Sequence, residues 1–149
     1  MIEGKWYPQG ADLSDLLPVR EAVFGRGRDA LDDESWNVLI WQDGAAVAAG
    51  RLWWRDGAFR LGDLCVLPDH RGQRIGDLVL RLLLFKAQSH FAREVRLCCP
   101  ADTAGFFARL GFRPSGECAP EGMEMVLPGD EIQLDSCAGC KKENCPNRV

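Results

Sequence analysis

Apolar and polar residues follow one another in the middle of the chain in the pattern of a β-meander. Residues 37–68 hold three apolar runs, and Asp-Gly pairs at 43–44 and 56–57 separate them. An Asp-Gly pair between apolar runs is a strong signal for a two-residue hairpin turn. We therefore expect three antiparallel strands here, with the third over residues 60–67.

Three other segments have the spacing of helices. Residues 10–25 place apolar side chains three and four positions apart, although Pro18 lies inside the segment. Residues 76–90 carry the broadest apolar face, and residues 102–112 form a shorter apolar segment. We expect this last helix to end at Gly111, since glycine commonly terminates helices.

Two further apolar stretches, at residues 94–100 and 122–128, are expected to be strands, and the polar residues 26–36 a loop or a short helical turn. The order is then helix, meander, helix, strand, helix, strand. It predicts one domain of the α/β (α+β) class over residues 1–128, built around a mixed sheet. Residues 129–149 are polar and contain clustered cysteines, so we expect them to form a separate tail.

Composition narrows the class of protein. The 149 residues are 46% hydrophobic, which is enough to bury the core of one domain. The net charge of −4 argues against nucleic-acid binding, because phosphate contacts require excess positive charge. We find no signal peptide and no apolar run that spans a bilayer, and therefore expect a cytoplasmic protein without membrane contact. Seven cysteines, an odd number, favour reduced thiols or metal ligands over a disulfide scaffold.

A basic, glycine-spaced turn precedes the strongest helix. The stretch "HRGQRIGD" contains Gly72 and Gly76, which permit close approach of the backbone, and Arg71 and Arg74, which add positive charge. The free amides at the start of a helix attract anions, so these features together predict a cradle for a pyrophosphate. The alternative is an ordinary turn with solvated arginines. The dinucleotide fingerprint G-x-G-x-x-G is absent.

Three stretches together resemble the GNAT superfamily of N-acetyltransferases. "CVLPDHRGQRIGDLVL" is similar to that family's acetyl-coenzyme A loop, whose signature is [Q/R]-x-x-G-x-[G/A]. "AGFFARLGF", at 104–112, is similar to the family segment that packs near the thioester, and "GRLWWRDGAFRLGDLCVLP" to its central hairpin. The later residues 110–125 resemble a bacterial branch, the ElaA-like acyltransferases. The resemblance covers roughly residues 1–128 and implies a GNAT fold, with a mixed, mostly antiparallel sheet flanked by helices.

The resemblance also implies a set of residues that bind the cofactor. The pantetheine arm of acetyl-coenzyme A would pair with the backbone of the strand before the loop, at Leu64, Cys65 and Val66. Phe106 belongs to the segment beside the thioester. The pyrophosphate would bind backbone amides of the six signature positions, which are Arg71, Gly72, Gln73, Arg74, Ile75 and Gly76. Arg74 replaces the middle glycine of the signature, a change compatible with binding if its backbone dihedral angles are ordinary.

The sequence offers few residues that could act as the acid or the base in proton transfer. In the family a tyrosine usually protonates the leaving thiolate, but here Phe107 stands at that position and the only tyrosine, Tyr7, lies far away along the chain. Asp63 resembles in position an acidic residue that some relatives use as the base. The alternative for Asp63 is a solvent-facing polar residue on a strand.

Several other residues could line the acceptor pocket, but the sequence supports them less. Glu117, Glu121 and Glu124 lie in the late segment, and the acidic stretch 29–35 could attract a cationic amine. For each of them a solvated surface position is the preferred interpretation. Trp53 and Trp54 point to opposite faces of a strand, and we expect core packing for both.

The cysteine-containing tail lies outside the family resemblance. Cys137, Cys140 and Cys145 have C-x2-C-x4-C spacing, and a C-x2-C pair lets two thiolates bind one metal. Zinc or an iron–sulfur cluster are the candidate groups, with Cys118, Cys65, a histidine or an external ligand in the fourth position. The alternatives are redox-active thiols or a flexible tail with incidental cysteines.

The sequence therefore predicts an enzyme that transfers an acetyl group from acetyl-coenzyme A to a primary amine on a small molecule or peptide. The amine would attack the thioester directly, and relatives often form homodimers. Two alternatives stay open. One is a catalytically silent module that only binds coenzyme A, and the other is a metal- or redox-responsive protein regulated through its tail.

Overall fold

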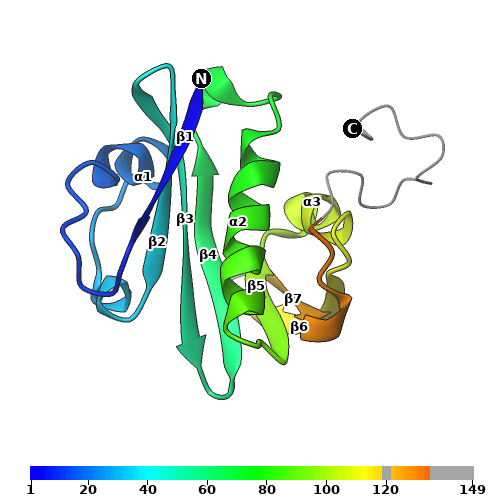
Figure 1. Ribbon diagram of the computed structural model, residues 1–149. Coiled ribbons are helices and arrows are strands. Elements are labelled where there is room, and N and C mark those ends of the chain that lie inside the picture. Colours follow the sequence, from blue (N-terminus) through cyan, green and yellow to red (C-terminus); the bar gives the residue numbers. More distant parts are fainter. Residues whose placement is uncertain (119–121, 135–149) are drawn as a thin grey trace.

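Seven strands form one mixed sheet at the centre of the molecule (Figure 1), in a computed structural model that describes residues 1–118 and 122–134. The order across the sheet is β1-β2-β3-β4-β5-β7-β6. Every neighbouring pair is antiparallel except β4 and β5, so the predicted mixed, mostly antiparallel sheet is confirmed. The strands are β1 (Ile2–Tyr7), β2 (Trp36–Gln42), β3 (Ala45–Arg55), β4 (Ala58–Val66), β5 (Glu94–Cys99), β6 (Arg113–Cys118) and β7 (Gly122–Pro128).

Helices cover both faces of the sheet, with α1 on one face and α2 and α3 on the other (Figure 1). The α-helices are α1 (Leu17–Phe24), α2 (Ile75–Ser89) and α3 (Ala104–Ala108). Short 3₁₀ helices are η1 (Ala30–Asp33), η2 (Pro68–His70), η3 (Ala101–Thr103) and η4 (Gly129–Glu131). Among the described residues, no helix is long and apolar enough to cross a membrane.

The predicted meander is confirmed as β2, β3 and β4. Both Asp-Gly pairs form its turns, and all four residues have positive φ, from 52° at Asp43 to 85° at Gly44. Asparagine, aspartate and glycine tolerate this left-handed region, which gives the turn the twist that a two-residue hairpin needs. The third strand begins at Ala58, two residues before its predicted start.

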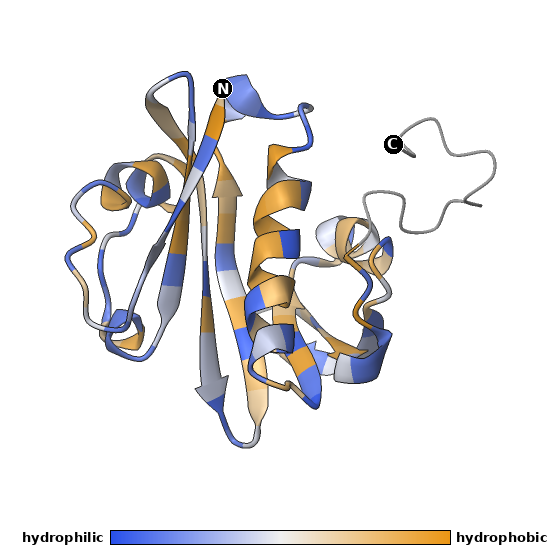
Figure 2. Cartoon of the chain, in the orientation of Figure 1, coloured by the Kyte–Doolittle hydropathy of each residue, from blue (hydrophilic) through white to orange (hydrophobic). Residues whose placement is uncertain are grey.

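The core lies mainly between the sheet and α2. The apolar face of α2 buries Ile75, Val79, Leu80, Leu83, Leu84 and Ala87, and this face is visible as the orange side of the helix in Figure 2. The helix lies close to β3 because Gly50 has no side chain. A Cβ atom at Gly50 would lie 2.9 Å from methyl carbons of both Val79 and Leu83. The predicted helix 76–90 is confirmed with its start one residue earlier.

The first predicted helix is much shorter than expected. Residues 10–25 were expected to be helical throughout, but α1 spans only Leu17–Phe24. Pro18 lies in its first turn, the one place where a missing amide costs no helical hydrogen bond. Leu13 and Leu16 are still buried. The spacing of the apolar residues in this part of the chain therefore marks buried positions of an irregular segment and not the face of a helix.

Two strands were missed, and both lie at edges of the sheet. In β1 only the last residue is buried, so its sequence lacks the alternation that marks a half-buried strand. β6 carries Pro114 and Gly116, has a register shift between them, and is mostly exposed. Proline and glycine normally weaken a strand prediction, but both are tolerated at a sheet edge.

Two predicted boundaries also change. The helix expected over 102–112 contains η3 and the five residues of α3, and Gly111 follows with φ of 103°. The division between domain and tail at residue 128 stays a prediction. Ile132 is buried and Leu134 packs against the same core, so the described packing continues past that point.

The sheet opens at its centre, between β4 and β5. Their parallel pairing joins only Phe59 with Val95 and Arg60 with Arg96. Beyond Arg60 the two strands no longer pair, and β4 continues alone on that side to Val66. β4 also contains one extra residue between its pairs with Arg51 and Ala49 of β3, which is a β-bulge at Asp63.

Candidate active site

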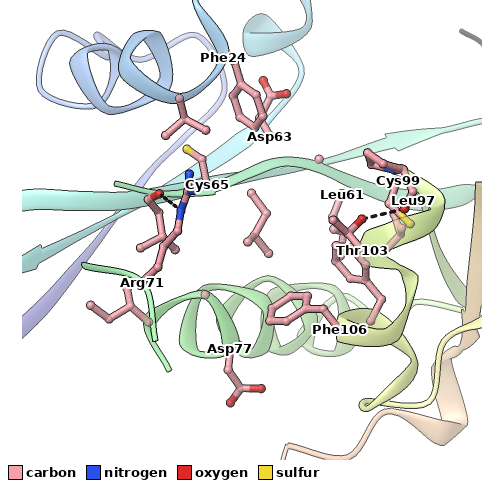
Figure 3. Close-up of a pocket in the computed structure, with 18 of the residues that line it drawn as sticks. Phe24, Leu61, Asp63, Cys65, Arg71, Asp77, Leu97, Cys99, Thr103 and Phe106 are labelled. Carbon is pink, nitrogen blue, oxygen red and sulfur yellow. Dashed lines mark hydrogen bonds between the residues drawn. The ribbon is translucent and has the colours of Figure 1, made fainter. Parts of the chain in front are cut away.

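A cavity of about 900 Å³ occupies the opening between β4 and β5. Residues from five parts of the chain line it: the end of α1, β4, the glycine turn with the start of α2, the end of β5, and α3. Figure 3 shows Phe24 and Asp63 on one side of β4, and Arg71, Phe106 and Asp77 on the other. The cavity therefore reaches both faces of the sheet where the strands part.

The glycine turn forms one end of this cavity. Gly72 has φ of 83° and Arg74 has φ of 64°, and α2 begins at the next residue. Arg74 therefore does not meet the condition of ordinary dihedral angles, because it takes the left-handed conformation that glycine adopts most readily. The first amides of α2 have no partner within the helix, as in every helix N-terminus. These amides and Arg74 border the cavity, where an anion would be favoured.

The strand predicted to hold the pantetheine arm also lies in the cavity. Leu64, Cys65 and Val66 belong to the part of β4 that has left β5. On its other side this part still pairs with β3, through Cys65 and Val66. The carbonyl oxygen of Val66 accepts a hydrogen bond of 2.9 Å from Nε of Arg71 (Figure 3). This segment thus offers backbone groups along its open edge.

Phe106 closes the cavity from α3. Its ring approaches the start of α2, and a Cβ atom at Gly76 would lie 3.6 Å from the ring carbon Cζ. Phe107, at the position of the family tyrosine, is buried against Phe106 and Phe112 in edge-to-face contacts. Tyr7 is buried in the smaller core on the α1 face and does not line the cavity, and its hydroxyl has no hydrogen-bond partner among the described residues.

Asp63 points into the cavity from the α1 face and is bound by three arginines. Its Oδ2 lies 2.9 Å from Nη1 of Arg26, 3.1 Å from Nη2 of Arg51 and 3.5 Å from Nε of Arg20, while Oδ1 accepts from the other Nη of Arg26. The side chain is only 8% exposed, so it is not the solvent-facing strand residue of the alternative interpretation. Asp63 has φ of 50°, a left-handed conformation that aspartate tolerates, and its carboxylate faces the arginines from the β-bulge.

The three arginines are shared with two more aspartates. Nη1 of Arg20 lies 2.8 Å from Asp32, which is buried, and Arg51 bonds to Asp29 at 2.7 Å and Asp32 at 3.2 Å. Arg20, Arg26, Arg51, Asp29, Asp32 and Asp63 therefore form one arginine–aspartate network with three positive and three negative charges.

The network corrects the interpretation of the acidic stretch 29–35. Burial alone would raise the pKa of Asp32, but hydrogen bonds from Arg20 and from the Asp29 amide outweigh burial and hold that pKa far below its usual range. Arg51 likewise lowers the pKa of Asp29 through a hydrogen bond. The interpretation as a solvated surface is therefore wrong for Asp32, which is buried, whereas Asp29, Asp33 and Glu34 are exposed.

Sequence reasoning did not find the arginines of this network. Apart from Arg26 and Asp29, which are three positions apart, the partners lie 12 to 43 positions away along the chain, so no local motif joins them. One signal was present, since Arg20 falls among Leu16, Val19 and Val23 on the apolar side of its segment. A charge at a core position requires a buried counter-charge, which is the pairing that the fold provides.

Comparison with known proteins identifies the family. Residues 34–114 match the family described as "Acetyltransferase (GNAT) domain", which is more than half of the chain.

The chain belongs to the GNAT acetyltransferases.

Three relatives illustrate this membership. The uncharacterized N-acetyltransferase YjcF of Bacillus subtilis is 28% identical over 131 residues, which cover 83% of this chain and 92% of YjcF. An acyl-CoA N-acyltransferase from Pseudomonas aeruginosa has a TM-score of 0.75 at 22% identity, covering 85% of this chain and 99% of its own. Escherichia coli ElaA has a TM-score of 0.70 at 23% identity, with the same two coverages. The predicted GNAT resemblance and N-acetyltransferase class are confirmed.

The cysteines that line the GNAT cavity are held as thiols. Burial raises the pKa of Cys65 to about 11, and desolvation together with contact with the Cys118 thiol raises that of Cys98 to about 12. Burial also raises the pKa of Cys99. Because the thiolate is the nucleophile, these side chains are poor nucleophiles near neutral pH. Cys99 is buried, whereas Cys98 on the opposite face of the strand is exposed.

Of the other residues weighed for the acceptor pocket, Glu117 is exposed and Glu121 lies outside the described residues. Glu124 lies in β7, where it accepts hydrogen bonds from Arg60, Arg96 and Ser115, and the arginines help to lower its pKa despite partial desolvation. Trp54 is half exposed, so core packing is wrong for it. Trp53 packs against Gly62.

The metal prediction falls outside the described residues. Cys137, Cys140 and Cys145 lie in the range 135–149, which the structure does not describe. Within 1–118 and 122–134, no group of three or more metal-ligating side chains occurs. Zinc or iron–sulfur binding by the tail therefore stays a prediction.

Proposed function

We propose that this GNAT acetyltransferase binds acetyl-coenzyme A in the cavity and transfers the acetyl group directly to a primary amine. The observation that carries the proposal is the parting of β4 from β5 beyond Arg60, which leaves a strand edge open beside the glycine turn. An extended amide-containing chain can pair with such an edge as a further strand would. A structurally similar protein, PaiA N-acetyltransferase from Thermoplasma acidophilum (TM-score 0.68, 15% identity), was solved in complex with coenzyme A.

The residues of the cavity fit the two ends of this cofactor. In the proposal, the pyrophosphate binds the amides between Arg71 and Gly76, with the charge of Arg74 beside them. The pantetheine arm pairs with Leu64, Cys65 and Val66, and Phe106 covers it from α3. Arg71 now occupies the Val66 carbonyl, so its side chain would turn away toward the phosphates when the arm binds.

Direct transfer is supported by the state of the thiols. An acyl-enzyme would need a reactive thiolate, and the pKa values of about 11 and 12 for Cys65 and Cys98 leave little thiolate near neutral pH. The enzyme then acts by aligning the two substrates and handling protons. We assign to Asp63 the role of receiving the amine and accepting its proton, and to water the protonation of the leaving thiolate, since Phe107 has no hydroxyl.

The test is a calorimetric titration of the reduced protein with acetyl-coenzyme A. An Arg71→Glu Arg74→Glu variant should lose at least tenfold in affinity, because it reverses two charges at the phosphate site. A matched control, Arg55→Glu Arg113→Glu, makes the same charge change at two exposed residues outside the cavity and should bind normally. Absence of binding by the folded wild type would refute the cofactor site.

A second measurement separates the enzyme from a silent binding module, which the phenylalanine at 107 favours. Release of coenzyme A in the presence of a panel of amines would demonstrate turnover. Mass spectrometry of the protein after incubation with acetyl-coenzyme A should detect no acetylated cysteine. A stable acetyl-cysteine that an amine discharges would instead indicate a two-step mechanism.

A further inference from the structure

The arginine–aspartate network has one open end. Of its six residues, only Arg26 and Asp63 line the cavity, whereas Asp32, Arg20 and Arg51 are buried beneath them. The Arg26 side chain is 46% exposed and that of Asp63 is 8% exposed. A ligand entering from the α1 face therefore meets one exposed guanidinium bound to one carboxylate.

This outer ion pair also blocks the carboxylate. Both oxygens of Asp63 already accept hydrogen bonds from the two Nη atoms of Arg26. An acceptor amine can reach Asp63 only if Arg26 moves away. Arg26 lies between Gly25 and Gly27 in the segment after α1, where the Gly25 amide donates to the Glu21 carbonyl and the Gly27 carbonyl accepts from Arg20. The backbone is held on each side, so Arg26 would move by a rotation of its own half-exposed side chain.

Asp63 does not depend on Arg26 for its neutralisation. When Arg26 moves, Arg51 at 3.1 Å and Arg20 at 3.5 Å still hold the carboxylate from below. The displaced guanidinium of Arg26 has no second carboxylate that is equally available to neutralise it. Its nearest other carboxylate, Asp29 at 3.9 Å, already binds Arg51 through both oxygens. An acceptor with only an amine would leave this arginine without a close carboxylate, with the Phe24 ring, 5.1 Å from its guanidinium carbon, as its neighbour.

From this asymmetry we infer that the acceptor is a free α-amino acid, whose ammonium group replaces Arg26 on Asp63 and whose carboxylate binds the displaced Arg26. The exchange preserves the neutrality of the network, because a zwitterion inserts into an ion pair without adding net charge. Val23 and Phe24 line the same end of the cavity, and Phe24 is 41% exposed, so the side chain of the amino acid is apolar. This inference rests on the proposed function and specifies its substrate class.

The chemical step balances without any further reactant. The α-ammonium group loses two protons in all, one of which reaches the leaving thiolate and one the solvent. A nitrogen–carbon bond forms to the acetyl carbonyl carbon, and the carbon–sulfur bond of the thioester breaks. The products are an N-acetyl amino acid, coenzyme A and one proton.

The experiment compares three forms of each acceptor with the wild-type enzyme. The probes are alanine, valine, leucine, methionine and phenylalanine as free acids, as carboxamides, and as the monoamines that lack the carboxyl group. Coenzyme A release gives kcat and KM for each. We expect at least one free acid to exceed its own carboxamide by roughly 10- to 100-fold in kcat/KM, the range for a hydrogen bond between charged groups. The monoamine should be poorer still.

Variants of Arg26 test whether this residue causes the preference for free acids over carboxamides. Arg26→Gln should remove it, raising KM for the free acid by at least tenfold while changing the carboxamide little, and Arg26→Lys should restore part of it. Arg28→Gln is the matched control, since Arg28 binds Asp33 and the Ala11 carbonyl and does not line the cavity. It should behave as wild type. A general loss of structure would lower acetyl-coenzyme A binding and both acceptor forms equally.

The outcomes separate the two proposals. Equal turnover of acids, carboxamides and monoamines would overturn the amino-acid inference and leave the acyltransferase proposal intact. Turnover of none of these acceptors by a protein that still binds acetyl-coenzyme A would also overturn the inference, with the cofactor site retained. Failure to bind acetyl-coenzyme A at all would refute the proposed function itself.

Discussion

The two sides of β4 form the site by different means. On the α2 side, the cavity is bordered by backbone amides, glycines and the ring of Phe106, and arginine side chains together with Asp77 and Asp102 add charge. On the α1 side, the central groups are six charged side chains contributed by α1, η1, β3, β4 and the segments between them. The α2 side is a local motif, whereas the α1 side is assembled from distant parts of the chain. We therefore expect damage to the α1 side to affect folding as well as acceptor binding.

The largest predicted effect comes from the buried centre of the network. Asp32→Ala leaves two buried guanidinium groups without their shared carboxylate and should lower the free energy of unfolding by about 3–5 kcal/mol. Urea denaturation measures this loss. Asp33→Ala is the matched control, since Asp33 is 67% exposed and pairs only with Arg28 at the surface. The control should change stability by less than about 1 kcal/mol. Equal effects of the two substitutions would show that the network does not support the fold.

Acid should weaken the α1 side first. The folded-state pKa values of Asp29 and Asp32 are depressed, so their contribution to stability is complete above the unfolded pKa of about 3.9 and is lost as pH falls toward the folded values. Urea midpoints measured from pH 6 down to pH 2 should fall steeply below about pH 4. Asp32→Asn should flatten this dependence. A slope as steep as that of the wild type would assign the acid sensitivity to other groups.

The α2 side has its own sensitive point, at the contact of α2 with β3. Gly50→Ala places a methyl group 2.9 Å from carbons of Val79 and Leu83 and should destabilise the protein by about 1–3 kcal/mol. Gly105→Ala makes the same chemical change in α3, where nothing lies within 4 Å, and should be neutral or stabilising by up to about 1 kcal/mol. Thermal denaturation distinguishes them. A neutral Gly50→Ala would mean that α2 can shift freely over the sheet.

The smallest predicted effect concerns the strained turn. Arg74→Gly should stabilise the fold by up to about 1 kcal/mol, because it removes a left-handed arginine, and should weaken acetyl-coenzyme A binding in a salt-dependent way. Phe91→Gly is the control, since Phe91 also has a left-handed φ of 59° and is 90% exposed outside the cavity. It should stabilise similarly and leave binding unchanged. Unchanged binding in both would remove Arg74 from the cofactor site.

Features that depend on neighbouring residues were predictable from the sequence. The turns at 43–44 and 56–57 follow from the tolerance of aspartate and glycine for positive φ, and α2 follows from an apolar face repeated every 3.6 residues. The prediction of an anion site at the glycine turn before α2 rests on the unpaired amides that every helix start has. The family resemblance assigned these features to a GNAT domain, and the family comparison confirmed that membership.

Features that depend on distant residues were decided only by the tertiary structure. β1 and β6 are strands because each has a neighbour to pair with, and the sequence of an exposed edge carries little sign of that pairing. Asp63 looked like a free carboxylate until folding brought Arg20, Arg26 and Arg51 to it from two other parts of the chain. Turn angles and helical periodicity are local energies that a short stretch determines alone. The partner of a buried charge is set by the packing of the whole domain, because only complete burial makes that partner necessary.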